Sequence, residues 1–288
     1  MYQMRVRVER TVSLRRKVSV IGCVLDREVK MARSGRISRR QFLPIGAAAA
    51  AQLAVPVRLR AQTKARTFVL VHGAWHGGWC WRRVADRLTA KGHYVLTPAL
   101  SGVGERSHLK PEDIDLMTQV NDVAGEIKWR DLDDVVLVGH SYGGMVITGV
   151  AEQMRERIGA IVYLDAFQPS DGQALADFSS RTSWPEPVTL APPASYFHVN
   201  DKDAAWVQSK LTAHPTQCFT QKLKVAGAYQ SIAKKLYIRA PLFAQKGFDQ
   251  ALARCRADHS WQTATVTCGH DVMIDQPAEL TAMLERFA

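Results

Sequence analysis

The run Asp134-Val-Val-Leu-Val-Gly-His-Ser-Tyr-Gly-Gly-Met-Val-Ile147 decides the fold of this chain. Its first part, Val135 to Val138, is apolar and β-branched like a buried strand, and its last residues begin a helical pattern. Between them, Gly139-His-Ser-Tyr-Gly143 has the G-x-S-x-G spacing of a sharp strand-to-helix turn. The serine of such a turn adopts strained backbone angles, and the flanking glycines avoid side-chain clashes. The motif therefore predicts that Ser141 is presented as a nucleophile.

Short β-branched runs alternate with helix-length segments on both sides of this turn. This alternation is typical of an α/β fold, in which a mainly parallel sheet is flanked by helices on both faces. We expect strands at Thr67–Val71, Tyr94–Thr97, Val135–Val138, Ile161–Leu164, Leu236–Arg239 and Thr263–Val266. We expect helices at Cys80–Lys91, Leu116–Trp129, Gly144–Arg155, Asp249–Ala257 and Pro277–Phe287.

The alternation breaks once, between residues 171 and 235. This stretch has several prolines and scattered aromatic side chains but no strong strand pattern. An irregular segment of about 65 residues inside a compact αβ repeat is typical of a functional lid rather than of a simple loop. We therefore predict a cap at about residues 171–235.

The charge of the chain is unevenly distributed. The formal net charge is +11, but residues 1–66 hold 16 basic and 3 acidic side chains. The remaining residues hold 22 basic and 24 acidic side chains, which is a net charge of −2. A nucleic-acid-binding surface needs clustered Lys and Arg on the folded part of the protein. We therefore expect no nucleic-acid partner.

The basic N-terminal region has the features of an export signal. Ser38-Arg-Arg-Gln-Phe-Leu43 precedes a weakly apolar stretch with five consecutive alanines, Ala47 to Ala51. This pattern resembles a bacterial twin-arginine signal, which implies a periplasmic or secreted protein that meets a membrane only during export. The alternatives are a basic membrane-surface anchor or a disordered arm on a cytoplasmic protein. We expect residues 1–61 to be this extension, with translation starting at Met31, and residues 62–288 to be the folded domain.

The cysteines of the folded domain show no metal-binding pattern. No Cys-x-x-Cys pair or Cys/His spacing indicates zinc, so we expect no metal site. Two disulfide states fit the sequence of an exported protein: one disulfide, such as Cys218 with Cys255, or buried free thiols throughout. The cysteines in question are Cys80, Cys218, Cys255 and Cys268.

Three segments together resemble a known family. They are Phe68-Val-Leu-Val-His-Gly-Ala-Trp-His-Gly-Gly-Trp-Cys-Trp81, the turn around Ser141, and Gly269-His-Asp271. Over Thr67–Ala288 the chain resembles the α/β-hydrolase superfamily, in the branch of plant methyl esterases, hydroxynitrile lyases and bacterial pyrethroid-type esterases. The resemblance implies the α/β-hydrolase fold, with the cap inserted after the sixth strand of the family's order. It also implies a Ser-His-Asp hydrolase with neither a metal nor an organic cofactor.

Within this resemblance, Ser141 needs a histidine and an acid. His270 follows the last expected strand, where the family's chain order of Ser, acid and His puts the base. In the plant enzymes the acid lies just beyond the penultimate strand, but here that place is the apolar Pro241-Leu-Phe243. Asp165, at the end of the preceding strand, is therefore the first candidate. Asp249 is the alternative acid, although it also fits a helix N-cap.

Attack on an ester carbonyl develops negative charge on its oxygen, and backbone N–H groups must meet that charge. By analogy with the family, the donors of this oxyanion hole are the amides of Tyr142, directly after the nucleophile, and Ala74, in the loop after the first strand. Trp75 and His76 in the same loop are candidates for an apolar substrate pocket.

The predicted function is that of a serine carboxylesterase, which cleaves small, fairly apolar esters through an acyl-enzyme. One alternative is a hydroxynitrile-lyase-like enzyme, but lyases of this branch carry threonine at the place of Gly73 and lysine at the place of Asp271. The other alternative is a ligand-binding protein of the same fold with negligible turnover. The sequence leaves the physiological ester and the oligomeric state open.

Overall fold

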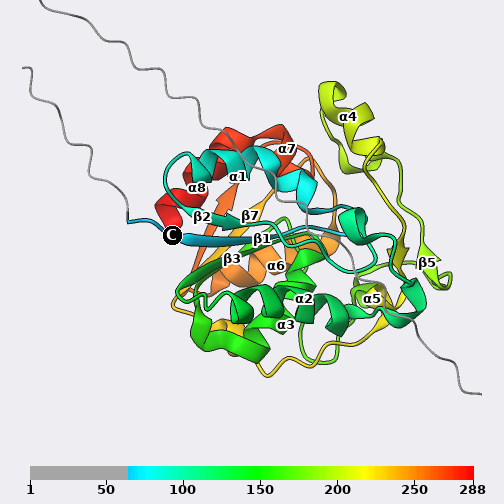
Figure 1. The fold of residues 1–288 in the computed structure, drawn as a ribbon, viewed down its shortest axis with the longest axis horizontal. Coiled ribbons are helices and arrows are strands. Elements are labelled where there is room, and N and C mark those ends of the chain that lie inside the picture. The colour runs from blue at the N-terminus through cyan, green and yellow to red at the C-terminus, as the bar shows by residue number, and fades with distance from the viewer. Residues whose placement is uncertain (1–63) are drawn as a thin grey trace, which may run out of the picture. The chain divides into compact units, whose positions relative to one another are not determined.

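The computed structural model describes residues 64–288 (Figure 1). The export signal expected at residues 1–61 lies outside the described residues. In the part of the chain that the structure describes, no helix is long and apolar enough to cross a membrane.

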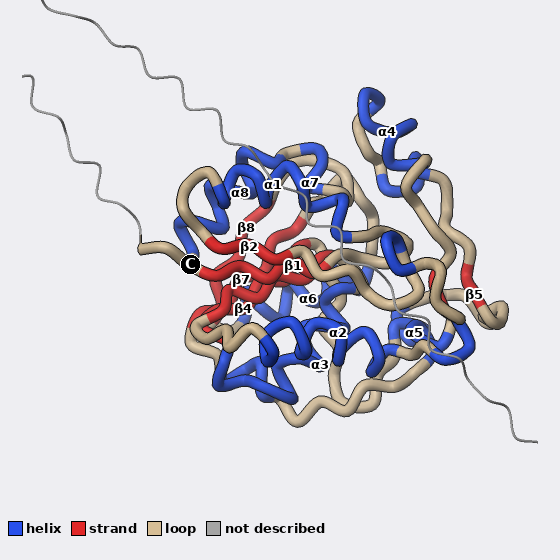
Figure 2. The backbone as a smooth tube through the Cα atoms, viewed as in Figure 1, coloured by secondary structure: helices blue, strands red, loops and turns tan. Residues whose placement is uncertain are grey.

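Six parallel strands form the central sheet of the described chain (Figures 1 and 2). Across the sheet they run in the order β2-β1-β3-β4-β7-β8, and each neighbouring pair is parallel. Every strand lies within about three residues of its expected bounds, so the predicted α/β-hydrolase sheet is confirmed. The bounds are β1 (Thr67–Val71), β2 (Tyr94–Leu96), β3 (Val135–His140), β4 (Ile158–Leu164), β7 (Lys234–Arg239) and β8 (Trp261–Thr265).

Helices cover both faces of the sheet (Figure 2). One face carries α1 (Arg82–Thr89), α7 (Val272–Asp275) and α8 (Pro277–Phe287). The opposite face carries α2 (Leu116–Trp129), α3 (Gly143–Met154) and α6 (Lys246–Ala257). The five expected helices are all present. Three begin elsewhere than expected. A 3₁₀ turn at Gly78–Trp81 precedes α1, α3 begins one residue early, and α6 starts earlier because the Gln245 side chain accepts the Gly247 N–H.

The first strand shows why the sheet strands are continuous apolar runs. Phe68 and Leu70 pack on the side of α1 and α8, whereas Val69 and Val71 pack on the side of α2 and α3. All four side chains are fully buried. A strand that is covered on both faces needs an apolar residue at every position. The sheet is therefore a fixed base from which the loops at the carboxyl ends of the strands project.

The chain leaves the sheet after β4 and returns at β7, and the segment between them contains the expected cap. Four short elements lie in it: β5 (Val188–Thr189), α4 (Asp201–Gln208), β6 (His214–Pro215) and α5 (Gln217–Thr220). In Figure 1, α4 and β5 lie at the right of the molecule, and α5 lies beside α2. β5 and β6 pair antiparallel over only two residues each. The guanidinium of Arg83 in α1 binds the Asp203 carboxylate in α4, at 2.6 and 2.7 Å, and so ties the cap to the sheet domain.

The four cysteines of the described chain are buried free thiols, and no disulfide joins Cys218 to Cys255. Burial raises the pKa of Cys255 to about 11 and that of Cys268 to about 12. These thiols therefore stay protonated at neutral pH and act as small apolar side chains.

Candidate active site

Ser141 lies in the sharp turn between β3 and α3. Its φ is +55°, a left-handed conformation that is strained for a residue with a side chain. A Cβ on Gly139 would lie 2.6 Å from the Gly143 carbonyl oxygen, and a Cβ on Gly143 would lie 2.8 Å from the His72 carbonyl oxygen. Only glycine fits at these two places without a shift of the backbone. The turn holds Ser141 at the carboxyl end of β3, where it lines a cavity.

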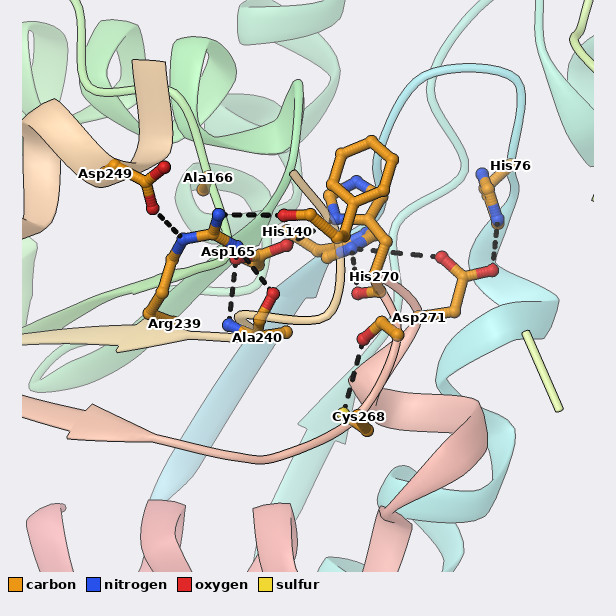
Figure 3. Close-up of polar contacts among 12 residues, drawn as sticks. His76, His140, Asp165, Ala166, Arg239, Ala240, Asp249, Cys268, His270 and Asp271 are labelled. Atoms are coloured by element: carbon orange, nitrogen blue, oxygen red, sulfur yellow. Dashed lines mark hydrogen bonds and ion pairs between the residues drawn. The ribbon is translucent and has the colours of Figure 1, made fainter. Parts of the chain in front are cut away.

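His270 and Asp165 are in direct contact (Figure 3). His270 Nδ1–H donates a hydrogen bond of 2.6 Å to Asp165 Oδ2, and both side chains are buried. Asp165 follows β4 and His270 follows β8, so the parallel sheet brings both to the same edge. With the proton on Nδ1, the neutral ring has a lone pair on Nε2 that can accept another proton. Ser141 and His270 line the same cavity.

The second oxygen of Asp165 is held by Arg239, which sequence reasoning did not identify. Asp165 Oδ1 accepts from Arg239 Nη1 at 2.6 Å and from the Ala240 N–H at 2.9 Å. The guanidinium also donates to the carbonyl oxygens of Ala240 and Phe243. The available signal was a single cation at the end of the apolar strand segment 236–238. Arg239 therefore fixes both the Asp165 carboxylate and the loop after β7.

Asp249, the alternative acid, does not contact His270. Asp249 Oδ1 accepts from Arg239 Nε at 2.9 Å, and its side chain is 63% exposed. It lies in the first turn of α6. The structure brings Asp165 to the imidazole, whereas Asp249 reaches the site only through Arg239.

The two expected oxyanion donors, Ala74 and Tyr142, both line the cavity with Ser141 and His270. Neither backbone N–H donates to another residue within the described chain. The Tyr142 hydroxyl is buried and donates to Gln119 Oε1 at 2.6 Å. Two uncommitted N–H donors beside the serine are what a developing oxyanion requires.

Two buried histidines hold the backbone around these residues. His72 Nδ1–H donates to the Gly73 carbonyl at 2.9 Å, and its Nε2 accepts the Leu100 N–H at 3.2 Å. His140 Nε2–H donates to the His270 carbonyl at 3.0 Å. Burial lowers the pKa of His72 to about 4, and burial together with the nearby His270 puts the pKa of His140 well below its ordinary value. Both rings are therefore neutral at pH 7 and position main chain.

Trp75 and His76 were both expected in the substrate pocket, but only Trp75 lines the cavity. Trp75 Nε1–H donates to the Thr189 carbonyl of the cap at 3.1 Å. His76 is buried outside the cavity lining, and its ring nitrogens bond to the Ala74 carbonyl and the Asp271 carboxylate. The expectation that His76 contacts the substrate is corrected, because both of its polar atoms are committed to the protein.

The cavity beside Ser141 and His270 has a volume of about 710 Å³. The His270 ring stacks on Phe243 at 4.3 Å and on Phe248 at 5.5 Å between ring centroids. The cap and the loop before α6 supply most of the wall. The wall is largely aromatic, but Arg181, Lys246 and several hydroxyl groups also line it, so a small ligand would meet both apolar surface and polar groups. The aromatic lining residues besides Trp75 and Tyr142 are Phe167, Phe178, Trp184, Tyr196, Phe197, Phe243 and Phe248.

Within residues 64–288, no group of three or more His, Cys, Asp or Glu side chains is arranged to hold a metal ion. The two carboxylates nearest the imidazole are both bonded to protein groups. Asp165 binds His270 and Arg239, and Asp271 binds His76.

Comparison with known proteins places this geometry in a family. Residues 68–283 match the alpha/beta hydrolase family. A carbendazim hydrolyzing esterase of Nocardioides sp. (strain SG-4G) is 40% identical over 235 residues, which cover 75% of this chain and 97% of that protein. Methylesterase 1 of Arabidopsis thaliana is 38% identical over 104 residues, which cover 35% of this chain and 40% of that protein.

Among solved structures, an extracellular alpha/beta-hydrolase from a Paenibacillus species has the same fold, with a TM-score of 0.66 at 24% identity. That match covers 77% of this chain and 99% of the other chain. With the sheet order, the serine turn and the family match in agreement, the chain belongs to the alpha/beta hydrolase family.

Proposed function

We propose that this chain is a serine carboxylesterase that hydrolyses small, fairly apolar esters through an acyl-enzyme. One observation carries the proposal: the 2.6 Å hydrogen bond between His270 and Asp165, in a cavity that also contains the strained Ser141. Ester hydrolysis is the activity that the comparisons support for this chain, because its relatives include a carbendazim hydrolyzing esterase and plant methylesterases.

In the first half of the reaction, Ser141 Oγ attacks the ester carbonyl carbon and its proton passes to His270 Nε2. The electron pair of the carbonyl moves to its oxygen, which accepts from the Ala74 and Tyr142 N–H groups. Asp165 keeps Nδ1 protonated and stabilises the imidazolium. When the intermediate collapses, the bond to the alcohol oxygen breaks, and His270 gives its proton to the departing alkoxide.

In the second half, a water molecule gives a proton to His270 Nε2 and attacks the acyl carbon. The second tetrahedral intermediate uses the same N–H donors. Its collapse breaks the bond to Ser141 Oγ, which recovers its proton from His270. The products are a carboxylic acid and the free enzyme, with no external oxidant or reductant.

Gly73 supports hydrolysis over cyanohydrin cleavage. A Cβ at this position would lie 2.9 Å from Ser141 Cβ and 3.0 Å from His140 Nδ1. The threonine that lyases of this branch carry there would therefore displace the nucleophile or its neighbour. The comparisons likewise do not favour the lyase alternative.

The proposal is tested with a series of 4-nitrophenyl esters and the full chain. We expect hydrolysis of the acetate and butyrate, whose short apolar acyl chains suit the aromatic part of the cavity wall. Ser141→Ala should reduce the rate to the uncatalysed background, whereas Ser107→Ala, at an exposed serine, should leave it unchanged. A folded wild-type chain that binds these esters without turnover would support the ligand-binding alternative instead.

We also propose that residues 1–61 direct export through the twin-arginine route. The proposal rests on the Arg39-Arg40 pair and the alanine run at Ala47–Ala51. Fractionation of bacteria that express the full chain should place esterase activity in the periplasm. Replacing both arginines by lysine should retain that activity in the cytoplasm, and a wild-type protein found only in the cytoplasm would contradict the proposal.

A further inference from the structure

His76 is only 1% exposed, and an oxygen faces each of its ring nitrogens. Nδ1 lies 2.8 Å from the Ala74 carbonyl oxygen, and Nε2 lies 3.0 Å from Asp271 Oδ2. Figure 3 shows the contact with Asp271. The ring stacks on Trp79 and meets the edge of Phe197. Aromatic side chains therefore fix the ring plane, and two acceptors fix its rotation.

These contacts decide how many protons the ring carries. A carbonyl oxygen can only accept, so Nδ1 holds a proton. The proton between Nε2 and Asp271 rests on the imidazole, because a carboxyl group is the stronger acid. Burial disfavours both charges, but the attraction and hydrogen bond between the two groups outweigh it. The pKa of His76 is raised, with help from the Ala74 carbonyl, and the pKa of Asp271 is lowered to about 2.

The histidines around this ring are placed differently. His72 and His214 each accept a backbone N–H at one ring nitrogen, and His140 Nδ1 has no partner among the described residues. Burial lowers the pKa of all three, so they are neutral at pH 7. Of these four neighbouring rings, His76 is the one that sits between two acceptors. The other titratable groups near the pair are Glu105, Cys80, Cys268, Asp275 and His270.

His76 joins the two loops that the proposed reaction depends on. Nδ1–H holds the carbonyl of the peptide between Ala74 and Trp75, which is strained because Trp75 has a φ of +64°. Nε2–H holds Asp271, the residue directly after His270. One ring thus fixes the loop of the oxyanion donor relative to the loop of the general base.

We propose that His76, doubly protonated and ion-paired with Asp271, is a positioning residue of the esterase site. This inference rests on the esterase function proposed above. The pair keeps the Ala74 N–H and the His270 ring at a fixed separation without touching the substrate, since His76 does not line the cavity. Placement at this scale matters, because a displacement of about 1 Å at a catalytic group can cost about a hundredfold in rate.

The proton count is tested first, without any substrate. In nitrogen–proton NMR spectra of the full chain at pH 7, His76 should give two ring N–H signals, assigned by their loss in His76→Gln. In Asp271→Asn the ring loses its counter-ion and should retain one signal. A wild-type ring with a single proton would overturn the inference.

Kinetics test the positioning role. His76→Gln and Asp271→Asn should each lower kcat by about ten- to a hundredfold, with KM changed less than about threefold. His76→Asn, whose shorter amide can still donate to the Ala74 carbonyl, should lose less. His93→Gln is the matched control: His93 is also buried but accepts the Arg66 N–H at the amino end of β1, so kcat should not change.

The outcomes separate this inference from the proposed function. Folded His76→Gln and Asp271→Asn proteins with wild-type kcat and a lowered Tm would show a purely structural pair and overturn the positioning role. A wild-type chain without esterase activity would overturn the proposed function and the positioning role with it. In that case the nitrogen spectrum would still show whether the His76 ring carries two protons.

Discussion

Asp165 and Asp271 are both fully buried aspartates close to His270, yet each faces a different partner (Figure 3). Asp165, 105 positions away in sequence, bonds the His270 ring, whereas the adjacent Asp271 bonds His76. The parallel sheet explains the first contact, because it sets the ends of β4 and β8 at one edge. Consecutive residues project their side chains in different directions, which explains the second.

The two carboxylates also differ in how their oxygens are used. Asp165 gives one oxygen to His270 and the other to Arg239 and a backbone N–H. Asp271 gives Oδ2 to His76, and its Oδ1 has no hydrogen bond within the described structure. The Asp165 loop is therefore arranged around an imidazole that gains and loses a proton. The Asp271 loop is arranged around the proposed ion pair with His76.

The largest difference between the two regions is expected in turnover. Asp165→Asn should lower kcat by about ten-thousandfold, because the amide no longer holds the productive tautomer of His270. KM should change little. Steady-state hydrolysis of 4-nitrophenyl butyrate measures the effect, with circular dichroism as the check on folding. A residual kcat above about a tenth of the wild-type value would remove Asp165 from the proposed triad.

The next largest effect is expected at Arg239. Arg239→Gln leaves the Asp165 carboxylate and two backbone carbonyls without the guanidinium, and breaking one side of a buried ion pair costs about 3–5 kcal/mol of stability. Urea denaturation should show this loss, with kcat falling about tenfold because Asp165 is held less firmly. Arg239→Lys keeps the charge but not the planar fork, so its loss should be smaller. An Arg239→Gln protein as stable as the wild type would contradict this account of the Asp165 region.

The ion pair of Asp271 with His76 should make the free energy of unfolding depend on pH. The pKa of Asp271 in the folded chain is about 2, against an ordinary value of 3.8. A lowered pKa stabilises the fold above pH 3.8, and this contribution is lost as the pH falls toward 2. At pH 6 the free energy of unfolding of Asp271→Asn should be lower than that of the wild type by about 2 kcal/mol.

The difference in the free energy of unfolding between the wild type and Asp271→Asn should shrink below pH 4. Urea denaturation at successive pH values measures it. At the other limit, the raised pKa of His76 gives stability that is complete below pH 6.5 and is lost as the pH rises through the folded value. A difference that stays constant from pH 3 to pH 9 would contradict the ion pair.

The smallest effect is expected at Asp249. Its side chain is 63% exposed and bonds only Arg239 Nε, so screening by water makes the ion pair weak. Asp249→Asn should leave kcat within about twofold and stability within about 0.5 kcal/mol of the wild type. A kcat loss like that of Asp165→Asn would move the acid to the loop after β7 and reverse the comparison.

The sheet could be predicted from the sequence because its strands are buried on both faces and therefore continuously apolar. The start of α2 could also be predicted, because Asp115 and Thr118 cap it reciprocally. The cap could not be predicted in detail. Its strands β5 and β6 are two residues long, and tertiary contacts such as the Trp75 indole to the Thr189 carbonyl hold it in place.

In the site, Ser141 and His270 could be located because a turn motif and a position after the last strand mark them. The choice between Asp165 and Asp249 could not be made from local pattern, since it depends on which carboxylate the folded sheet brings to the imidazole. The prediction that His76 lines the pocket failed because the partners of its ring are set by the fold and not by neighbouring residues. Its true partner, Asp271, lies 195 positions away and becomes visible only in the fold.

The central claim is that Ser141 is an activated nucleophile served by His270, and one labelling experiment tests it most directly. The full chain is treated with a fluorophosphonate, and the adduct is located by peptide mass mapping. The account predicts a single adduct on Ser141, abolished in His270→Ala and strongly slowed in Asp165→Asn. No adduct on a folded wild-type chain, or an adduct that persists at full rate in His270→Ala, would contradict it.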